Sequence, residues 1–405
     1  MHHLLTFIQT NMFTRQEYNI IKRRLEEPRK FIQVVMGPRQ VGKSTVVKQV
    51  LKEIAIPHLL FLADDIPASN RAWISDCWEQ ARVLLRVQKA SEVVLVIDEI
   101  QKIQGWSEIV KKEWDMDSYQ DVSVKVLLLG SSRVLLEKGL ADSMAGRYEE
   151  IRMGHWSYAE MHDAFGWSLD QYVFYGGYPG SATLIEDEDR WRDYVQSAIV
   201  DATINKDILQ NTVITKPALL KQTFELASAY SGEIVSLTKM LGQLQDAKNT
   251  TTLSGYLNLL EQAGLVGGLQ KYSNDMARKR TSIPKYQVFN NALKTVFVNK
   301  DFSQAVLDRK LWGRIFESAV GSHLMNEAFR HRLSLYYWRD GNDEVDFILQ
   351  KKSQVIAIEV KSNDEQDTHG LHVFQDKFHP RLSVIVGRSG IPAEAFLSMN
   401  LKELF

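Results

Sequence analysis

The octapeptide Gly37–Ser44 has the residue types and spacing needed to bind phosphate. It reads GPRQVGKS and fits the pattern G-x-x-x-x-G-K-S/T at every position. The apolar run Phe31–Met36 before it has the length of a strand, and a helix is expected from Lys43. The glycines let the backbone curl so that its N–H groups face phosphate oxygens at a helix N-terminus. We therefore expect a nucleotide-binding loop here.

A second run, Val93–Ile97, is apolar and ends in two adjacent acids, Asp98 and Glu99. A buried strand followed by carboxylates is what Mg²⁺-dependent phosphoryl transfer to water requires. We expect Ser44 and Asp98 to hold Mg²⁺ and Glu99 to polarise the attacking water. Lys43 is expected to reach the β- and γ-phosphates of ATP.

Two further positions complete the predicted ATP site. The strand Val126–Leu129 is followed by Ser131, whose hydroxyl could lie beside the γ-phosphate. Arg147 is a candidate arginine finger acting within its own chain or on a neighbouring copy, with Arg133 as competitor; a surface ion pair is the alternative for either. The predicted cofactor-binding residues are Gly37, Pro38, Arg39, Gln40, Val41, Gly42, Lys43, Ser44, Thr45 and Ser131.

Charged residues near the C-terminus form a second candidate site. Glu317 lies in the expected helix GRIFESAVGSHL, and Asp346 lies in the strand that follows it. In the next strand Glu359 and Lys361 point to the same face, because strand side chains alternate. Asp346 and Glu359 could bind a divalent metal, and Lys361 could activate water or stabilise charge on phosphate. The alternative is a retained fold in which these residues form ion pairs.

The middle of the chain reads mostly helical, with the segment Thr250–Glu261 as the best-defined helix. A hairpin is expected after Gly264, and its far side holds Arg278, Lys279 and Arg280. Residues 205–300 carry 12 Lys and Arg against 6 Asp and Glu. This pattern is typical of a winged helix with a basic wing that contacts DNA phosphates. The alternative is a packing or protein-binding module.

Several of these motifs together resemble a known family. GPRQVGKST, VLVIDEIQKI, LLLGSSRVLL and SMAGRYEE are similar to the AAA+-type ATPases of a large prokaryotic family that carries a C-terminal domain of unknown function. GGYP, FESAV, EVDF and IEVKS extend the resemblance over nearly the whole chain. The order of Glu317, Asp346, Glu359 and Lys361 also resembles the PD-(D/E)xK restriction-endonuclease-like fold. The chain departs from that motif because Val345, not proline, precedes Asp346.

The pattern of elements predicts an α/β protein of three units. Strands alternating with helices favour a parallel sheet of the P-loop NTPase, AAA+-type class in the first unit. A helical, winged-helix-like unit follows, and a small α/β endonuclease-like domain ends the chain. The expected bounds are residues 1–165, 166–300 and 301–405.

The net charge does not indicate a kind of partner, because the chain has 49 Lys and Arg and 50 Asp and Glu, a formal net charge of −1. The one cysteine, Cys77, excludes an internal disulfide and fits a reducing compartment. No apolar run is long enough for a membrane span. We expect a soluble, cytoplasmic protein.

Two functions fit these features. The leading hypothesis is a Mg²⁺-dependent ATPase that acts on DNA through the middle unit and a nuclease-like C-terminal domain. If Arg147 acts on a neighbouring copy, a homo-oligomer follows. The alternative is an ATP-dependent switch or scaffold that binds a protein partner and retains an inactive nuclease-like fold.

Overall fold

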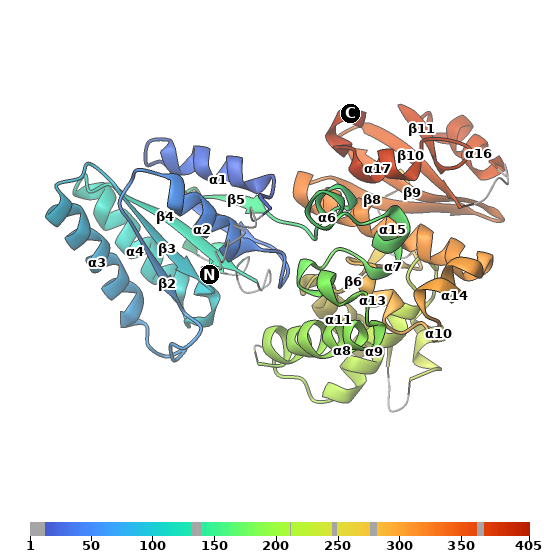
Figure 1. The fold of residues 1–405 in the computed structure, drawn as a ribbon, viewed down its shortest axis with the longest axis horizontal. Coiled ribbons are helices and arrows are strands. Elements are labelled where there is room, and N and C mark those ends of the chain that lie inside the picture. Colours follow the sequence, from blue (N-terminus) through green and yellow to red (C-terminus); the bar gives the residue numbers. More distant parts are fainter. Residues whose placement is uncertain are drawn as a thin grey trace, which may run out of the picture.

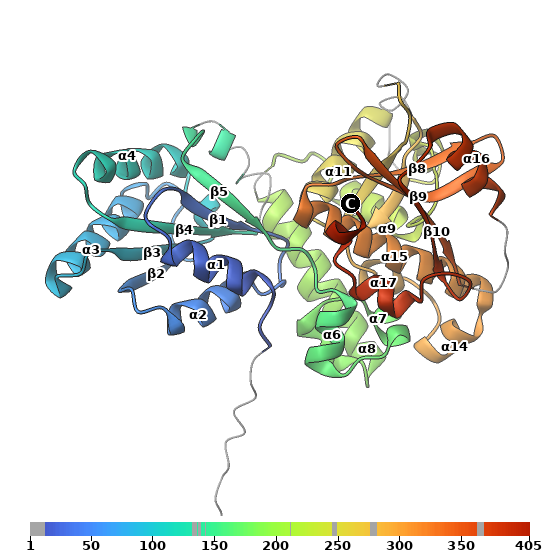
Figure 2. The same ribbon diagram turned by 90° about the horizontal axis from the view of Figure 1, so that it is seen from above.

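The chain forms two lobes in the computed structural model (Figures 1 and 2). The structure describes residues 13–131, 136, 139–141, 143–210, 212–244, 249–275, 282–362 and 368–405. The first lobe runs through strand β5, and the second contains the helices and strands from α6 to the C-terminal end.

The first lobe alternates strands with helices, as the sequence pattern predicts. Its elements are α1 (Glu17–Glu26), β1 (Ile32–Met36), α2 (Lys43–Glu53), β2 (His58–Leu62), α3 (Ala72–Gln88), β3 (Val93–Asp98), η1 (Ile100–Lys102), α4 (Trp106–Tyr119), β4 (Val124–Gly130) and β5 (Tyr148–Arg152). The predicted strands before Gly37, before Asp98 and before Ser131 are all confirmed. The edge strand β5 has no counterpart in the prediction, because its polar sequence YEEIR lacks an apolar run.

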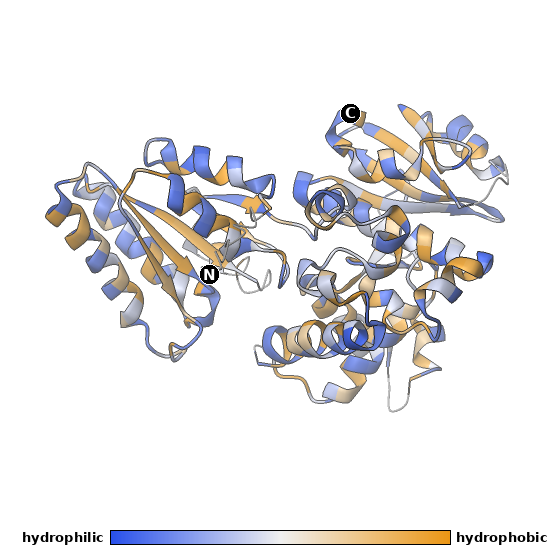
Figure 3. Cartoon of the chain, in the orientation of Figure 1, coloured by the Kyte–Doolittle hydropathy of each residue, from blue (hydrophilic) through white to orange (hydrophobic). Residues whose placement is uncertain are grey.

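The five strands form one parallel sheet in the order β2-β3-β4-β1-β5. The central strands β1, β3 and β4 are buried along their whole length because helices cover both faces. In β1, Val34 packs into the hydrophobic cluster on one face and Val35 into the cluster on the other. Figure 3 shows this apolar band through the centre of the lobe. All five strands end at the same edge, so the loops after β1, β3 and β4 lie together there.

The second lobe begins with helices and ends with a sheet. Its helical elements are α6 (Tyr158–Phe165), α7 (Leu169–Tyr175), η2 (Pro179–Leu184), α8 (Glu188–Asp193), η3 (Tyr194–Asp201), η4 (Ile204–Leu209), α9 (Pro217–Ala229), α10 (Leu237–Leu241), α11 (Thr250–Gln262), α13 (Ala292–Thr295), α14 (Phe302–Leu307), α15 (Arg309–His331), α16 (His369–Phe378), α17 (Ala393–Ser398) and η5 (Leu401–Leu404). Both η3 and η4 are π-helical.

Six strands of this lobe form a single mixed sheet. They are β6 (Val266–Lys271), β7 (Lys285–Val288), β8 (Ser334–Asp340), β9 (Asp343–Lys351), β10 (Gln354–Lys361) and β11 (Leu382–Gly387). Their order is β11-β10-β9-β8-β6-β7, so the hairpin β6–β7 joins the C-terminal strands through the pairing of Gln270 with Tyr336. One hydrophobic core extends from Trp156 to Leu401. Sheet and core are therefore continuous across residue 300, where the sequence predicts a boundary.

Candidate functional site

The loop between β1 and α2 has a backbone that two glycines make possible. Gly42 has φ of +92°, a conformation that side-chain-bearing residues rarely adopt. Gly37 lies so close to the next segment that an added Cβ would be 2.2 Å from the carbonyl oxygen of Met153. The curled loop is therefore fixed by its glycines, as the sequence motif predicts.

Lys43 is folded back onto this loop. Its Nζ donates to the carbonyl oxygens of Gly37 at 2.9 Å and Pro38 at 2.8 Å. Burial lowers the pKa of the Lys43 ammonium, although the carboxylates of Glu99 and Asp98 favour the charged form. The ammonium is held by neutral carbonyl groups, which an anionic ligand could replace.

Ser44 and Asp98 are in direct contact at the bottom of the loop. The Ser44 hydroxyl donates to Asp98 Oδ2 at 2.5 Å, and the backbone N–H of Glu99 donates to Asp98 Oδ1 at 2.9 Å. Burial raises the pKa of Asp98, and the Ser44 hydrogen bond opposes this shift. A hydroxyl and a carboxylate brought together are the oxygen ligands that Mg²⁺ prefers. The two predicted metal ligands therefore fit Mg²⁺.

Glu99 follows the strand in the left-handed region, with φ of +55°. Its Oε2 accepts hydrogen bonds from Ser131 Oγ at 2.9 Å and from Gln101 Nε2 at 2.5 Å. Ser131, at the end of β4, thus lies beside the acid that we expect to polarise water. Gln101 was not predicted from the sequence, because a glutamine two residues after an acid carries no recognisable motif.

The second lobe contacts the phosphate-binding loop directly. Asp207 in η4 accepts two hydrogen bonds from Arg39, at 2.5 Å to Nε and 2.6 Å to Nη2. The Tyr194 hydroxyl donates to Gln40 Oε1 at 2.9 Å, and Gln40 Nε2 donates to the carbonyl oxygen of Ala198 at 3.2 Å. No sequence signal identifies these contacts, since Asp207 lies 168 residues from Arg39.

Three further residues, Arg15, Trp156 and Gly264, contact the loop. Arg15 Nη1 donates to the carbonyl oxygens of Val41 at 2.9 Å and Gly154 at 3.0 Å. Trp156 Nε1 also donates to Val41 O, at 3.1 Å. Pro38 packs closely on Gly264 of the second lobe, where an added Cβ would lie 2.9 Å from the proline ring. The loop is therefore clamped between the lobes.

The hollow beside Gly37 and Pro38 is small. Its volume is about 20 Å³, whereas ligand pockets commonly enclose about 300–1,000 Å³. Residues of both lobes line it: Gly37, Pro38, Ser131, Glu261, Gln262, Ala263, Gly264, Phe289, Asn326 and Phe329. A bound nucleotide that filled this hollow would therefore require the two lobes to move apart here.

Arg147 lies at the end of the first sheet where the strands begin, opposite the end that carries the phosphate-binding loop. Its carbonyl oxygen accepts from the N–H of Ile32, the first residue of β1, and its guanidinium pairs with Asp115 at 2.7 Å. A five-residue strand places this edge about 16 Å from the phosphate-binding loop. The structure thus corrects the option that Arg147 acts on phosphate within its own chain. The competing Arg133 lies outside the described residues.

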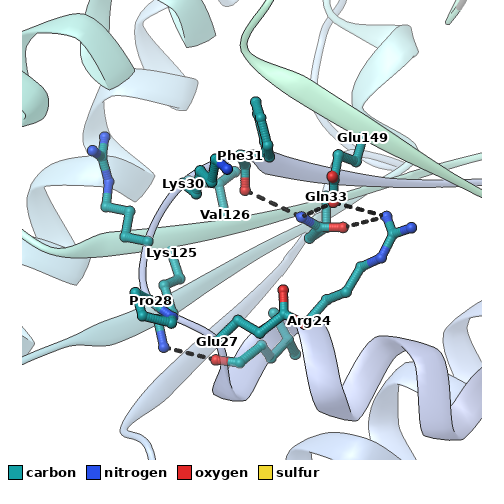
Figure 4. A pocket seen from close by; sticks show the side chains of 11 residues that line it. Arg24, Glu27, Pro28, Lys30, Phe31, Gln33, Lys125, Val126 and Glu149 are labelled. Carbon is teal, nitrogen blue, oxygen red and sulfur yellow. Dashed lines mark hydrogen bonds and ion pairs between the residues drawn. The ribbon is translucent and has the colours of Figure 1, made fainter.

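A separate pocket of about 330 Å³ opens at this same edge (Figure 4). Figure 4 shows the Arg24 guanidinium directed at Gln33 and Glu149, to which it is bonded at 2.9 and 3.1 Å. Lys125 Nζ donates to Leu25 O at 2.8 Å and pairs with Glu92. Within the pocket Arg24 and Glu149 form an ion pair, and the pocket is remote from the predicted site.

The C-terminal residues predicted as a second site come from adjacent elements. Glu317 lies in α15, Asp346 in β9, and Glu359 and Lys361 in β10. Lys361 Nζ is 2.9 Å from Glu359 Oε1, and Asp346 Oδ2 accepts from the backbone N–H of Val360 at 2.8 Å. Burial, followed by the charge of Asp346, raises the pKa of Glu359 to about 8.

A lysine missed by the sequence analysis lies among these acids. Lys285 of β7 is fully buried, and its Nζ is 2.7 Å from Glu317, 3.5 Å from Asp346 and 3.6 Å from Glu344. Burial disfavours the charged form of Lys285 and would lower its pKa, but these carboxylates raise the pKa well above the ordinary value. Burial raises the pKa of Glu317 to about 7, although Lys285 favours its charged form.

The Lys285 ammonium supplies the positive charge that a divalent metal would bring to this cluster. Within the described ranges, no group of three or more His, Cys, Asp or Glu side chains could hold a metal ion. Glu317, the third predicted carboxylate, is bonded to the lysine instead. The arrangement does not fit the divalent metal expected at Asp346 and Glu359.

The middle elements follow one another as helix, short bridge, helix, helix and hairpin. α9 is followed by the pairing of Ile234 with Lys285, then by α10, α11 and the hairpin β6–β7. Asn249 Oδ1 accepts from the N–H of Thr252 and so caps α11. α11 carries no lysine or arginine. The predicted basic wing, Arg278, Lys279 and Arg280, lies outside the described residues.

Family models match three successive segments of the chain. Residues 29–162 match the family described as "AAA domain". Residues 166–303 and 312–395 match "Domain of unknown function (DUF8612)" and "Domain of unknown function (DUF4143)". The first match supports an AAA-type ATPase N-terminal region, with which the five-stranded parallel sheet is consistent. Such a region implies the use of a nucleotide, typically with Mg²⁺.

Two relatives match most of the chain at low identity. An "Uncharacterized protein" of Haemophilus influenzae is 24% identical over 358 residues, which cover 84% of each chain. "Uncharacterized protein MJ1544" of Methanocaldococcus jannaschii is 21% identical over 337 residues, 78% of this chain and 72% of the relative.

A crystal structure of Saccharomyces cerevisiae RIF2 aligns at 13% identity over 42% of this chain and 69% of its own, with a TM-score of 0.27. This value is too low to support a common fold. No helix within the described part of the chain is long and apolar enough to cross a membrane.

Proposed function

We propose that the chain is a Mg²⁺-dependent ATPase whose nucleotide state controls the second lobe. The observation that carries this proposal is the contact between Ser44 and Asp98 beneath the phosphate-binding loop, with Glu99 at the end of the same strand. The AAA domain match over residues 29–162 supports it.

The roles of the residues follow from their positions. Lys43 exchanges the carbonyl groups of its loop for the β- and γ-phosphates, and the loop N–H groups bind phosphate oxygens. Ser44 and Asp98 hold Mg²⁺, which supplies neutralisation of phosphate charge when it is bound. Glu99 orients the attacking water, and Ser131 fixes the Glu99 carboxylate.

An arginine for this site comes from a neighbouring copy in our proposal. Arg147 lies at the far edge of its own sheet, so it can reach a phosphate only in another chain. The ATPase is then a homo-oligomer with its active site between subunits. In the monomer Arg147 pairs with Asp115, which would release the guanidinium upon assembly.

The catalytic role of Glu99 is tested by Glu99→Gln. We expect the variant to retain ATP binding and to hydrolyse ATP at least about 100-fold more slowly, because the amide cannot accept a proton from water. Steady-state phosphate release and nucleotide affinity should be measured together. Glu108→Gln, at an exposed pair with Arg71 in the same lobe, is the matched control. An undiminished rate in Glu99→Gln would remove the proposed role.

The proposed target of the ATPase is DNA, contacted by the middle unit. The order of α9, α10, α11 and the hairpin β6–β7 supports a winged-helix-like unit, and the wing residues Arg278–Arg280 would contact phosphates. ATP hydrolysis should be measured with and without duplex and single-stranded DNA, and the DNA scored for cuts. Stimulation with cleavage lost in Lys361→Ala would establish an ATP-coupled nuclease.

The buried Lys285 favours a second candidate, a nucleotide-dependent switch with a C-terminal fold that does not cleave. In this reading the cluster of Lys285, Glu317 and Asp346 holds the hairpin to the C-terminal strands, and a protein is the partner. Hydrolysis that is indifferent to DNA, with the DNA unbound and intact, would support this candidate over the first.

A further inference from the structure

The helix that follows α8 is π-helical where it meets the phosphate-binding loop. Residues Tyr194–Asp201 and Ile204–Leu209 form two π-helical stretches separated by a short α-helical step. We call residues 194–209 the π segment. Such stretches are rare, are usually a single turn long and are frequent at functional sites. Three residues of the π segment, Tyr194, Ala198 and Asp207, contact the loop.

The strongest of these contacts is the ion pair of Arg39 with Asp207. It is bidentate, with both carboxylate oxygens bonded, and the Asp207 side chain is only 8% exposed. A guanidinium binds phosphate with the same forked geometry that it uses for a carboxylate. Asp207 therefore occupies the anionic partner position of an arginine that belongs to the phosphate-binding loop itself.

The pair lies within the charge cluster of the predicted ATP site. Burial lowers the pKa of Lys43; the Asp207 carboxylate opposes this shift and the Arg39 guanidinium adds to it. The Glu99 carboxylate in turn raises the pKa of Arg39. An incoming triphosphate would compete with Asp207 for the Arg39 guanidinium.

The loop conformation also depends on the π segment. Gln40 has φ of +59°, a left-handed backbone conformation that is strained for a residue with a side chain. Its side-chain amide is bonded at both ends to the π segment, through Tyr194 and Ala198. The segment therefore holds the loop in the form seen here, in which Lys43 is folded onto the carbonyl oxygens of Gly37 and Pro38.

We propose that Arg39 exchanges partners with nucleotide state, binding Asp207 in the empty site and a phosphate of ATP in the occupied one. Loss of the pair releases the π segment, which contacts α11 and leads into α9. The inference rests on the proposed ATPase function and describes how nucleotide binding would affect the second lobe. Because such coupling is reciprocal, a ligand that draws Asp207 away from the loop strengthens ATP binding.

Asp207→Asn tests the exchange in the full chain, with binding of a fluorescent, non-hydrolysable ATP analogue in the presence of Mg²⁺ as the readout. We expect about tenfold tighter binding, because the neutral amide competes less well for Arg39. In an Arg39→Gln background the same change should alter affinity less than twofold, which a merely structural role of Asp207 would not explain. Asp201→Asn, at an exposed pair with Lys221 on the same segment, is the matched control and should bind as the wild type does.

A second measurement needs no variant. Amide hydrogen exchange in residues 198–209 of the wild-type chain should become several-fold faster when ATP binds, since the segment loses its anchor. Unchanged or weaker ATP binding by Asp207→Asn, an equal gain in the Arg39→Gln background, or slower exchange with ATP would each overturn the exchange while leaving the ATPase intact. A wild-type chain that binds no ATP would remove the proposed function and this inference with it.

Discussion

Lys43 and Lys285 are both buried and lie near carboxylates, but they are arranged differently. Lys43 donates to backbone carbonyl groups, while the nearby Asp98 is bonded to a serine hydroxyl and a backbone N–H. Lys285 instead lies directly against Glu317, with Asp346 and Glu344 just beyond. Lys43 and the acids near it are thus bonded to neutral partners, whereas Lys285 forms ion pairs with the acids around it.

This difference determines what each site can accept. In the first lobe burial lowers the pKa of the lysine, so an arriving phosphate gains by stabilising its charge. In the second lobe the carboxylates raise the pKa of Lys285, so the cation is already matched. A buried charge is tolerated when it is paired, and a charge already paired needs no ligand. We infer that the first site is built for exchangeable ligands and the second for a fixed structural pair.

The largest expected effect is that of Lys43→Ala. Removing the ammonium should abolish detectable ATP binding and hydrolysis, a loss of more than about 100-fold, because Lys43 is the residue that carries positive charge to the β- and γ-phosphates. Nucleotide affinity and phosphate release provide the measurement. Lys48→Ala, at an exposed position of the same helix, is the control. Normal ATP binding by Lys43→Ala would contradict the assignment of the site.

A change of the second lysine should affect stability rather than ATP. Lys285→Met should lower the free energy of unfolding by about 3 kcal/mol, since it leaves half-buried carboxylates unpaired. Chemical denaturation measures the loss, and Lys402→Met on the exposed surface is the control. Adding Glu317→Gln should restore part of the stability.

Mn²⁺ should raise the melting temperature of Lys285→Met but leave that of the wild type unchanged. Binding of Mn²⁺ by Asp346 and Glu359 of the wild type would show instead that the second site also accepts a ligand.

The smallest effect concerns pH. The pKa of Glu359 is raised to about 8 in the folded state, so the folded chain holds a proton there that the unfolded chain releases above about pH 4.3. Stability from this group is therefore present at low pH and is lost as the pH rises through 8. The stability of Glu359→Gln relative to wild type should improve by on the order of 1–3 kcal/mol between pH 5 and 8.

This pH dependence is measured by denaturation at several pH values, with Glu403→Gln as the exposed control. A difference between Glu359→Gln and wild type that stays constant from pH 5 to 8 would show that Glu359 titrates in its ordinary range. The C-terminal cluster would then be better solvated than its burial implies.

Local sequence determined the strands and loops that position the predicted ATP site. The apolar runs before Gly37, Asp98 and Ser131 mark β1, β3 and β4, and their chain order is enough to bring the three loops to one sheet edge. The reason is that a strand buried on both faces must be apolar throughout, and parallel strands all end on the same side. The helix carrying Glu317 and the strands carrying Asp346 and Glu359 were found by the same patterns.

Only the tertiary structure decided which charges meet. With 49 basic and 50 acidic residues in the chain, spacing alone cannot select Asp207 for Arg39 or Lys285 for Glu317. The pairing of β5 with β1 placed Arg147 at the edge away from its own phosphate-binding loop. The pairing of β6 with β8 carried Lys285 of the hairpin into the C-terminal acids. Motifs encode the chemistry of neighbours in sequence, whereas ion pairs between distant segments depend on how the sheets and lobes pack.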